Sequence, residues 1–290
     1  MDSHPGLTII CTSSNGLSTA QTLSQQLNLP ITGSENYSSI LSTSLGFDFA
    51  LVVDDQGLQL QELRGNSLGA LRVDFTNSSL EFRRRQNLQN ELLAKAIGIR
   101  GVHNPLVWDV TAGMGQDSLL LASLGCEVTM FERNDIIHAL LSDGLRRATD
   151  GACNDKGSYE ASNHSTLSAA LARITLHHVD AITALKQSDP PTPDIIYIDP
   201  MFPEKRKNTK ARKAMQYCQQ IVGQDEDSDE LLRAALNGAR YRVVVKRPKT
   251  AAFLDNHAPS GQLQGKTIRY DIYALRSSDN YFDEKNKMIR

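Results

Sequence analysis

The sequence contains 290 residues, of which 40% are hydrophobic and 22% are charged, and its formal net charge is −2. These proportions are typical of a folded globular protein and exclude a largely disordered chain. A chain this close to neutrality does not coat a nucleic acid or a membrane with its whole surface, although a local basic patch is compatible with it.

The four cysteines, at positions 11, 126, 153 and 218, have irregular spacings and form no Cys-x-x-Cys pair. This pattern disfavours both a disulfide framework and a zinc site, so we expect reduced thiols and no metal. The N-terminal residues lack the basic and then apolar pattern of a signal peptide. No apolar run approaches the ~20 residues that cross a bilayer. These features predict a soluble, cytoplasmic protein.

The first 77 residues predict a small α/β or strand-rich module. Leucine spacing favours a helix over Ser18–Leu27, and Asp54–Gly57 has the composition of a turn. Short apolar or alternating runs indicate the strands of this module. The predicted strands cover Leu7–Thr12, Phe47–Val53, Leu58–Leu63 and Leu71–Phe75.

A helix is predicted to follow, beginning at Ser78 and ending at Gly98. Ser78-Ser79-Leu80-Glu81 has the form of a capping box, and glycine is a common residue at a helix end. Three arginines, at positions 83 to 85, occupy the first turns of this helix, where the helix dipole disfavours positive charge. They form either a solvated face or a contact to phosphate.

From Pro105 onward, apolar strands alternate with amphipathic helices, and Thr149–Asn163 is expected to form a loop or an insertion. The alternation predicts a mostly parallel, doubly wound α/β sheet in a second domain, residues 78–290. The expected strands are Leu106–Thr111, Glu127–Glu132, Ile174–Val179, Ile195–Ile198, Val243–Lys246 and Ile268–Leu275. The expected helices are Ser118–Leu124, Ile136–Leu145, Leu167–Leu171 and Asp229–Ala239.

A Gly-x-Gly motif, Gly113 and Gly115, lies between the first of these strands and its helix. Glycines at such a turn allow a ligand to approach the backbone closely. Glu132 ends the next strand, about 20 residues after Gly113, where an acidic side chain accepts hydrogen bonds from the ribose hydroxyls of a nucleoside cofactor. Asp180 ends the third strand, where it either accepts from an adenine amino group or only shapes a loop.

The fourth strand runs into Asp199-Pro200-Met201-Phe202. This turn would place a carboxylate, carbonyl groups and an aromatic ring at the carboxyl edge of the sheet, where doubly wound folds have their active sites. Stacking of a nucleobase on an aromatic ring contributes about 1–3 kcal/mol. Although a plain turn has the same composition, we predict that Asp199, Pro200 and Phe202 are catalytic.

Basic residues are concentrated directly after this turn, since six of the ten residues from Glu204 to Lys213 are lysine or arginine. Three more cations, Lys246, Arg247 and Lys249, follow the fifth strand at the same sheet edge. Charged runs are usually solvated, but the convergence of the two groups on one edge favours contact with a nucleic acid backbone. The predicted RNA-binding residues are Lys205, Arg206, Lys207, Lys246 and Arg247.

Four segments together resemble the ribosomal RNA small subunit methyltransferase J family. They are Asp109–Asp117, Glu132-Arg133, Asp199–Pro203 and Val243–Pro248, and the resemblance covers roughly residues 78–275. It implies a Rossmann-like class I methyltransferase fold, S-adenosylmethionine as cofactor, and transfer of a methyl group to N2 of a guanosine. The implied partner is 16S ribosomal RNA or the small ribosomal subunit.

The resemblance also implies a set of residues that hold the cofactor. Gln116 and Asp117 line its methionine end, Glu132 and Arg133 meet the ribose and its surroundings, Asp180 and Ala181 flank the adenine, and Asp199 is the last contact. Three other functions stay open. They are a nicotinamide-dependent oxidoreductase, which the missing third glycine disfavours, a methyltransferase for DNA or protein amines, and a non-catalytic RNA-binding assembly factor.

Overall fold

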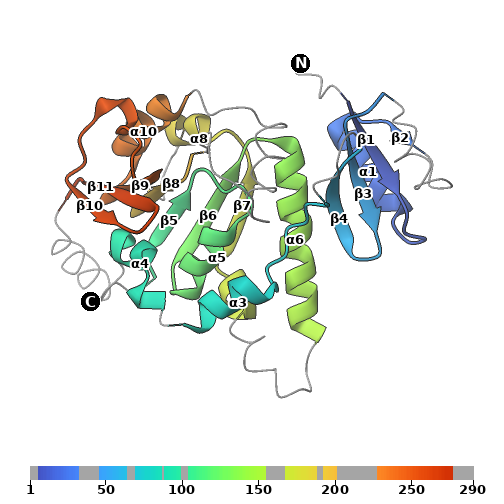
Figure 1. Cartoon of the computed structure of the whole chain (residues 1–290), viewed down its shortest axis with the longest axis horizontal. Helices are drawn as coiled ribbons and strands as arrows, with labels where there is room; N and C mark the ends of the chain where they lie inside the picture. Colours follow the sequence, from blue (N-terminus) through green and yellow to red (C-terminus); the bar gives the residue numbers. More distant parts are fainter. Residues whose placement is uncertain are drawn as a thin grey trace. The chain divides into compact units, whose positions relative to one another are not determined.

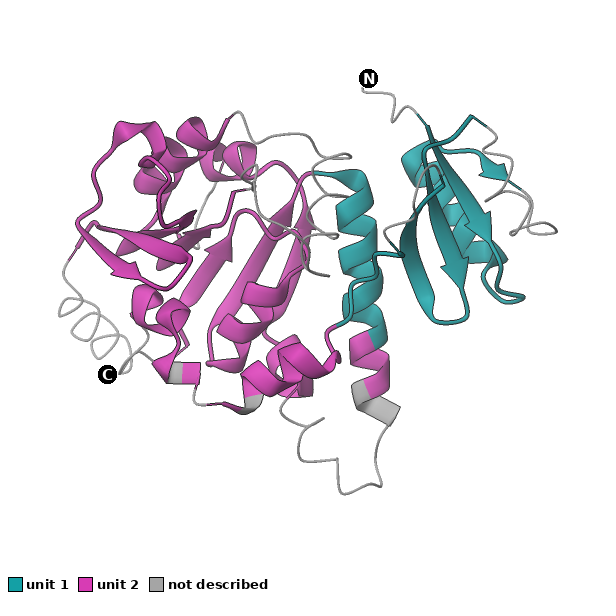
Figure 2. Cartoon of the chain, viewed as in Figure 1, with its two compact units in different colours: residues 1–74, 134–147, 203–223 teal, residues 75–133, 148–202, 224–290 magenta. Residues whose placement is uncertain are grey.

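The computed structural model in Figure 1 describes residues 6–32, 46–63, 69–86, 88–98, 104–154, 167–187, 192–200 and 227–276. These residues form two compact units (Figure 2). The first contains the described residues of 1–74 and 134–147, and the second contains the described residues of 75–133, 148–202 and 224–290. We propose a domain boundary at residue 77, between a small N-terminal module and a second domain of residues 78–290.

The first unit contains a four-stranded sheet with the strand order β2-β1-β3-β4. Strand β1 is parallel to β2 and to β3, whereas β4 is antiparallel to β3. The elements are β1 (Leu7–Cys11), α1 (Leu17–Leu27), β2 (Ile31–Thr32), β3 (Phe49–Asp54) and β4 (Gly57–Glu62). This arrangement confirms the predicted mixture of strands and one helix.

The strand predicted over Leu71–Phe75 is wrong. Only Leu71 pairs, through an isolated bridge to Leu60. Leu71, Val73 and Phe75 are nevertheless buried, with exposed fractions of 8%, 3% and 1%. The alternating pattern therefore reflects side chains that pack into a core from an extended segment, without a ladder of backbone hydrogen bonds.

Helix α6 (Asp135–Asn154) is longer than the predicted Ile136–Leu145. The loop predicted from Thr149 therefore begins after Asn154, and residues 155–163 lie outside the described part of the chain. Residues 134–147 belong to the first unit. Within that unit the Asp143 carboxylate accepts a hydrogen bond from the Leu58 N–H at 2.9 Å, and the Arg147 guanidinium donates to the Val73 carbonyl at 2.5 Å.

The second unit is built on a seven-stranded sheet with the order β10-β11-β9-β8-β5-β6-β7 (Figure 1). Strands β5 to β9 are mutually parallel, and β11 runs antiparallel to both β9 and β10. The strands are β5 (Leu106–Asp109), β6 (Glu127–Glu132), β7 (Ile174–His178), β8 (Ile195–Ile198), β9 (Arg242–Pro248), β10 (Gly261–Gln264) and β11 (Ile268–Ala274). The predicted mostly parallel sheet is confirmed.

The short helices of this unit that precede β5 in the chain are α3 (Ser78–Arg85), η2 (Leu88–Asn90) and α4 (Leu92–Ile97). The short helices between later strands are α5 (Gln116–Ser123), α8 (Ala181–Gln187), α10 (Ser228–Gly238) and η3 (Leu254–Asn256). The single helix predicted from Ser78 to Gly98 is wrong, because the backbone becomes extended at Gln86. The N-cap is Asn77, whose side chain accepts from the Leu80 N–H at 2.9 Å. Gly98 does end α4, in a left-handed conformation with φ 73°.

The topology brings the ends of the parallel strands to one edge of the sheet. Strands β5 and β8 lie side by side at its centre, with β6 next to β5 and β9 next to β8. The chain reverses its winding direction between β5 and β8, and ligand sites of doubly wound folds lie at this point. The four strands end at or just before Asp109, Glu132, Asp199 and Pro248.

Candidate active site

The loop between β5 and α5 depends on two glycines. Gly113 and Gly115 have φ angles of 51° and 68°, in the left-handed region that glycine adopts at little cost. A Cβ atom built on Gly113 would meet only the Thr111 carbonyl oxygen among the described atoms within 4 Å, at 3.9 Å. The backbone of the predicted Gly-x-Gly motif is therefore strongly turned, and the space beside Gly113 is open to a ligand.

Asp109, the last residue of β5, holds this loop from inside. Its Oδ1 accepts a hydrogen bond from the Thr111 N–H at 3.2 Å, and its Oδ2 accepts one from the Ser118 hydroxyl at 2.5 Å. Burial raises the pKa of Asp109 to about 7. The sequence pattern indicates Asp109 only as the first residue of the segment Asp109–Asp117 and predicts no separate role for it. An acidic residue at the end of the strand before a glycine loop is the signal that would have identified it.

Glu132 and the glycine loop lie together, as the spacing predicts. The Glu132 carboxylate, at the end of β6, accepts a hydrogen bond from the Gly113 N–H at 3.1 Å. The neighbouring Arg133 forms ion pairs with Asp227 and, at 3.5 Å, with Asp180. Glu132, Arg133 and Asp180 thus form a continuous polar edge beside the loop.

Asp180 also starts helix α8. Its Oδ1 accepts hydrogen bonds from the Thr183 N–H at 2.9 Å and from the Thr183 hydroxyl at 3.1 Å. This is the pattern of an N-cap residue. Ala181, the first residue of the helix, is buried. The loop-forming interpretation of Asp180 therefore describes a contact that the residue makes, and it does not compete with a role beside adenine.

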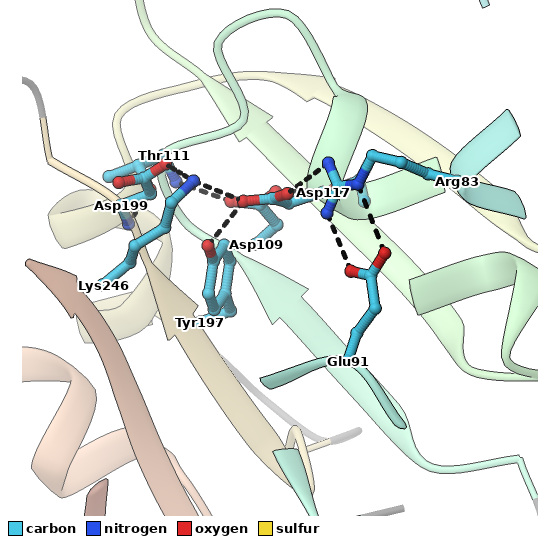
Figure 3. Close-up of polar contacts among 9 residues, drawn as sticks. Arg83, Glu91, Asp109, Thr111, Asp117, Tyr197, Asp199 and Lys246 are labelled. Carbon is cyan, nitrogen blue, oxygen red and sulfur yellow. Dashed lines mark hydrogen bonds and ion pairs between the residues drawn. The ribbon is translucent and has the colours of Figure 1, made fainter. Parts of the chain in front are cut away.

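The most strongly charged part of the edge is a cluster of four residues, Asp117, Tyr197, Asp199 and Lys246, which we call the Lys246 cluster (Figure 3). The Lys246 ammonium donates to Oδ2 of Asp117 at 2.8 Å and to Oδ2 of Asp199 at 2.7 Å. The Tyr197 hydroxyl donates to the same Asp117 oxygen at 2.7 Å. One cation is therefore shared by two carboxylates.

The environment shifts the pKa values of the cluster in opposite directions. Burial by itself lowers the pKa of Lys246, but the two carboxylates outweigh burial and raise it. Burial by itself raises the pKa of Asp117, but the charge of Lys246 and the hydrogen bonds from Lys246 and Tyr197 outweigh burial and lower it. The pKa of Asp199 is raised, because burial and the charge of Asp117 outweigh Lys246. Of the two carboxylates, Asp199 is the one that binds a proton more readily.

A second cation reaches the cluster from helix α3. Arg83 Nη1 lies 4.0 Å from Asp117 Oδ1, and Arg83 forms an ion pair with Glu91 at 2.8 Å (Figure 3). Its neighbour Arg84 donates through Nε to the Ser123 hydroxyl at 3.1 Å. Sequence reasoning left the arginines as either a solvated face or a phosphate contact, whereas the structure gives Arg83 an acidic partner in the site.

The backbone of Asp199 is tied to the loop of the neighbouring strand. Its N–H donates to the Thr111 hydroxyl at 2.6 Å, which joins the ends of β8 and β5. Pro200 follows and is buried. The predicted aromatic residue Phe202 and the predicted RNA-binding residues Lys205, Arg206 and Lys207 lie outside the described residues.

Lys246 and Arg247, for which the sequence predicts RNA contacts, are both engaged within the protein. Lys246 is 24% exposed and belongs to the cluster described above. Arg247 is 6% exposed and donates to the Ala252 carbonyl at 2.7 Å. Neighbouring side chains of a strand point to opposite faces, so the two cations enter the protein on different sides of the sheet. Neither lies on an open basic surface.

Within the described residues, no group of three or more histidine, cysteine, aspartate or glutamate side chains has the arrangement of a metal site. Over the same residues, none of the helices combines the length and apolar character needed to cross a bilayer.

Comparisons with known proteins agree on one family. Residues 39–275 match the family described as "Putative SAM-dependent methyltransferase". A relative from Cellvibrio japonicus named "Ribosomal RNA small subunit methyltransferase J" is 41% identical over 270 residues, which cover 92% of this chain and 97% of the relative. A relative of the same name from Saccharophagus degradans is 43% identical over 233 residues, or 79% of this chain and 84% of the relative.

A solved structure supports the same relationship. The crystal structure of a SAM-dependent methyltransferase from Neisseria gonorrhoeae has a TM-score of 0.65 and 31% sequence identity to this chain. The match covers 94% of this chain and 98% of that protein. The seven-stranded sheet described above is therefore the sheet of a class I methyltransferase, and S-adenosylmethionine is the cofactor.

Proposed function

Since this chain belongs to the ribosomal RNA small subunit methyltransferase J family, we propose that it methylates the exocyclic N2 of a guanosine in 16S ribosomal RNA. One observation carries the assignment of the site. Asp199 is held at the carboxyl edge of the sheet, beside the loop that contains Gly113: its backbone N–H donates to the Thr111 hydroxyl, and its carboxylate accepts from Lys246. A nucleobase amine and a cofactor that both bind at this edge lie next to each other.

The residues at the glycine loop fit S-adenosylmethionine. The open space beside Gly113 admits a ligand, and the Glu132 carboxylate next to it suits the two hydroxyl groups of a ribose. We assign the methionine end of the cofactor to Gln116 and Asp117, at the start of α5. The remaining proposed contacts are Gly115, Arg133, Asp180, Ala181 and Asp199.

When bound, S-adenosylmethionine supplies an electrophilic methyl group: the amine nitrogen bonds to the methyl carbon, the carbon–sulfur bond breaks, and one amine proton passes to water. The protein's part is to orient the amine, because proximity and orientation contribute most when the leaving group is already good. Guanine presents N–H donors at N1 and N2, and the Asp199 carboxylate is an acceptor that complements them. Asp199 and Pro200 would orient the amine, and Phe202 would stack on the base.

The RNA backbone is proposed to contact Lys205, Arg206 and Lys207, which directly follow the catalytic turn in the sequence. A guanine amine inside a duplex is poorly accessible, so the target base is flipped out of its stack or lies in a single-stranded loop. The partner is 16S ribosomal RNA, either naked or within the small subunit.

The proposal is tested by methyl transfer from labelled S-adenosylmethionine to 16S RNA from cells that lack this protein, followed by mass mapping of the product. Asp199→Ala should lower the rate by at least about 100-fold, the effect of removing one well-placed polar group from an active site. Asp55→Ala, at an exposed residue of the β3–β4 turn, is the control and should be unchanged. Undiminished transfer by Asp199→Ala, or no N2-methylguanosine with the wild-type protein, would contradict the proposal.

A further inference from the structure

We propose that Lys246 is a positioning residue for methyl transfer, which holds the carboxylates of Asp117 and Asp199 in their working arrangement and makes no contact with RNA. This inference rests on the proposed function, because it concerns the same site. Three independent features of the structure support it: the place of Lys246 in the sheet, the charges that surround it, and the second attachment of Asp199.

The sheet fixes where the Lys246 side chain lies. Strand β9 is paired with β8 on one side, in a register that joins Val245 to Ile198, the last residue of β8. The next residues along these two strands are Lys246 and Asp199. On the other side, Lys246 is paired with Tyr270 of β11, a buried residue. Strands on both sides therefore confine the lysine, whose side chain is directed to Asp117 and Asp199 (Figure 3).

The charge of Lys246 is required by its surroundings. A partly buried ammonium is costly without acidic partners, and two carboxylates at hydrogen-bond distance supply them. Besides Tyr197, which belongs to the cluster, the groups that face these carboxylates are Arg83 from α3, Asp109 from β5 and Tyr270 from β11. Arg83 lies farther from Asp117, at 4.0 Å, and already pairs with Glu91. Without Lys246, the two aspartates would repel each other with little compensation.

Lys246 also completes the orientation of Asp199. The backbone of Asp199 is held by the Thr111 hydroxyl at 2.6 Å, and one oxygen of its side chain is held by Lys246 at 2.7 Å. A carboxylate that is fixed at both its backbone and one oxygen cannot rotate freely. The attachment therefore aims the Asp199 carboxylate and opposes the rise in its pKa that burial and Asp117 cause, so it favours the charged form that accepts a hydrogen bond from an amine.

The test compares Lys246→Met, which removes the charge at similar length, with Lys246→Arg, which retains it. The control is Lys95→Met, an exposed residue of α4, whose neighbour Ala96 contacts Arg242 at the opposite end of β9. Three quantities are measured for each: kcat/KM against pH, affinity for S-adenosylhomocysteine against pH by calorimetry, and affinity for 16S RNA against salt without cofactor. The RNA measurement needs no activity.

Removing an opposite charge near a carboxylate raises its pKa, so activity should be lost at higher pH as the solution is acidified. In Lys246→Met we expect the acid limb of kcat/KM to move up by about one to three pH units. The acid limb of S-adenosylhomocysteine affinity should move in the same direction, because the pKa of Asp117 also rises. Lys246→Arg should restore most of the wild-type profile. RNA affinity and its salt dependence should equal those of the wild type and of Lys95→Met.

An unchanged acid limb in Lys246→Met, or a salt slope reduced by about one, as expected on loss of one phosphate contact, would overturn the inference. If Lys246→Met fails to fold, the pH profiles of Lys246→Gln and Lys246→Arg test the inference instead. The neutral glutamine must shift the acid limb of kcat/KM, and the cationic arginine must not. A wild-type protein that methylates no guanosine would refute the proposed function alone. The pH dependence of S-adenosylhomocysteine affinity would then still decide the role of Lys246.

Discussion

We predict that the hydrogen bond between the buried side chains of Ser118 and Asp109 stabilises the folded protein by an amount that depends on pH. Replacing Ser118 by alanine removes the hydroxyl that donates to Asp109 Oδ2 at 2.5 Å. Ser118 is 0% exposed and Asp109 is 2% exposed, so water does not readily replace the lost donor. Burial raises the pKa of Asp109 to about 7 in the folded protein, compared with about 3.9 in the unfolded chain.

The sign of the pH effect follows from these two pKa values. A carboxyl group whose pKa is raised on folding binds its proton more tightly in the folded state. Its contribution to stability is therefore fully present below about pH 4 and is lost as the pH rises through about 7. For three pH units the loss is about 4 kcal/mol at most. At pH 8.5 the Asp109 carboxylate is charged, and it depends most on the donors that remain.

The expected cost of Ser118→Ala is about 1.5–3 kcal/mol at pH 8.5, because the hydrogen bond is then made to a charged group. At pH 5.5 the carboxyl group is neutral in the folded protein, and the cost falls to about 0.5–1.5 kcal/mol. The difference of roughly 1 kcal/mol corresponds to a further rise in the pKa of Asp109.

The measurement is urea unfolding at both pH values, followed by the fluorescence of Trp108. This residue is the only tryptophan of the chain, is 8% exposed and precedes Asp109 directly. Ser123→Ala is the matched control, because Ser123 lies on the same helix and its hydroxyl donates to the Leu119 carbonyl, which does not titrate. An equal cost of Ser118→Ala at both pH values, or a larger cost at pH 5.5, would refute the reasoning.

Two further changes test the cofactor and RNA contacts. Glu132→Gln should weaken S-adenosylhomocysteine binding by about 10-fold to 100-fold, because it replaces a charged acceptor. Calorimetry measures this effect, and Glu127→Gln, at the exposed start of the same strand, should have none. Replacing Lys205, Arg206 and Lys207 together by alanine should reduce the slope of log affinity for RNA against log salt by about two to three. An unchanged slope would show that these residues are only solvated.

Local pattern predicted most of the second unit well. The strands Glu127–Glu132 and Ile195–Ile198 have the predicted bounds, and β5 and β7 are shorter at their carboxyl ends than expected. Strands buried on both faces form short, continuous apolar runs, and polar residues mark the two ends of each run. The bounds of such strands are therefore visible without knowledge of their neighbours.

The helical predictions failed where tertiary contacts override local pattern. Apolar spacing from Leu88 to Ile97 continues a helical face, yet helix α3 ends at Arg85 and the backbone becomes extended at Gln86. Arg83 and Glu91 form an ion pair across this break. Helix α6 extends beyond its predicted end at Leu145. Within the first unit, its Asp143 and Arg147 side chains form hydrogen bonds with the backbone of Leu58 and Val73. Contacts between segments so distant in the sequence leave no periodic trace.

The candidate site divides in the same manner. The approach of Glu132 to Gly113 could be predicted, because parallel neighbouring strands bring their carboxyl ends to one edge. The position of Lys246 at that edge could also be predicted, but its partners could not. A run such as Val-Val-Val-Lys-Arg-Pro has the same composition whether its cations face phosphate or carboxylate.

The amino-acid sequence by itself determined the alternation of strands and helices, the turned glycine loop and the family to which the chain belongs. These properties depend on residues close together in the chain, or on motifs whose spacing is set by whole strands and helices. Only the tertiary structure decided that Lys246 is shared by Asp117 and Asp199 and that Arg247 is buried on the other face. The partners of a charged side chain depend on which strands become neighbours and in what register, and that is settled only when the sheet forms.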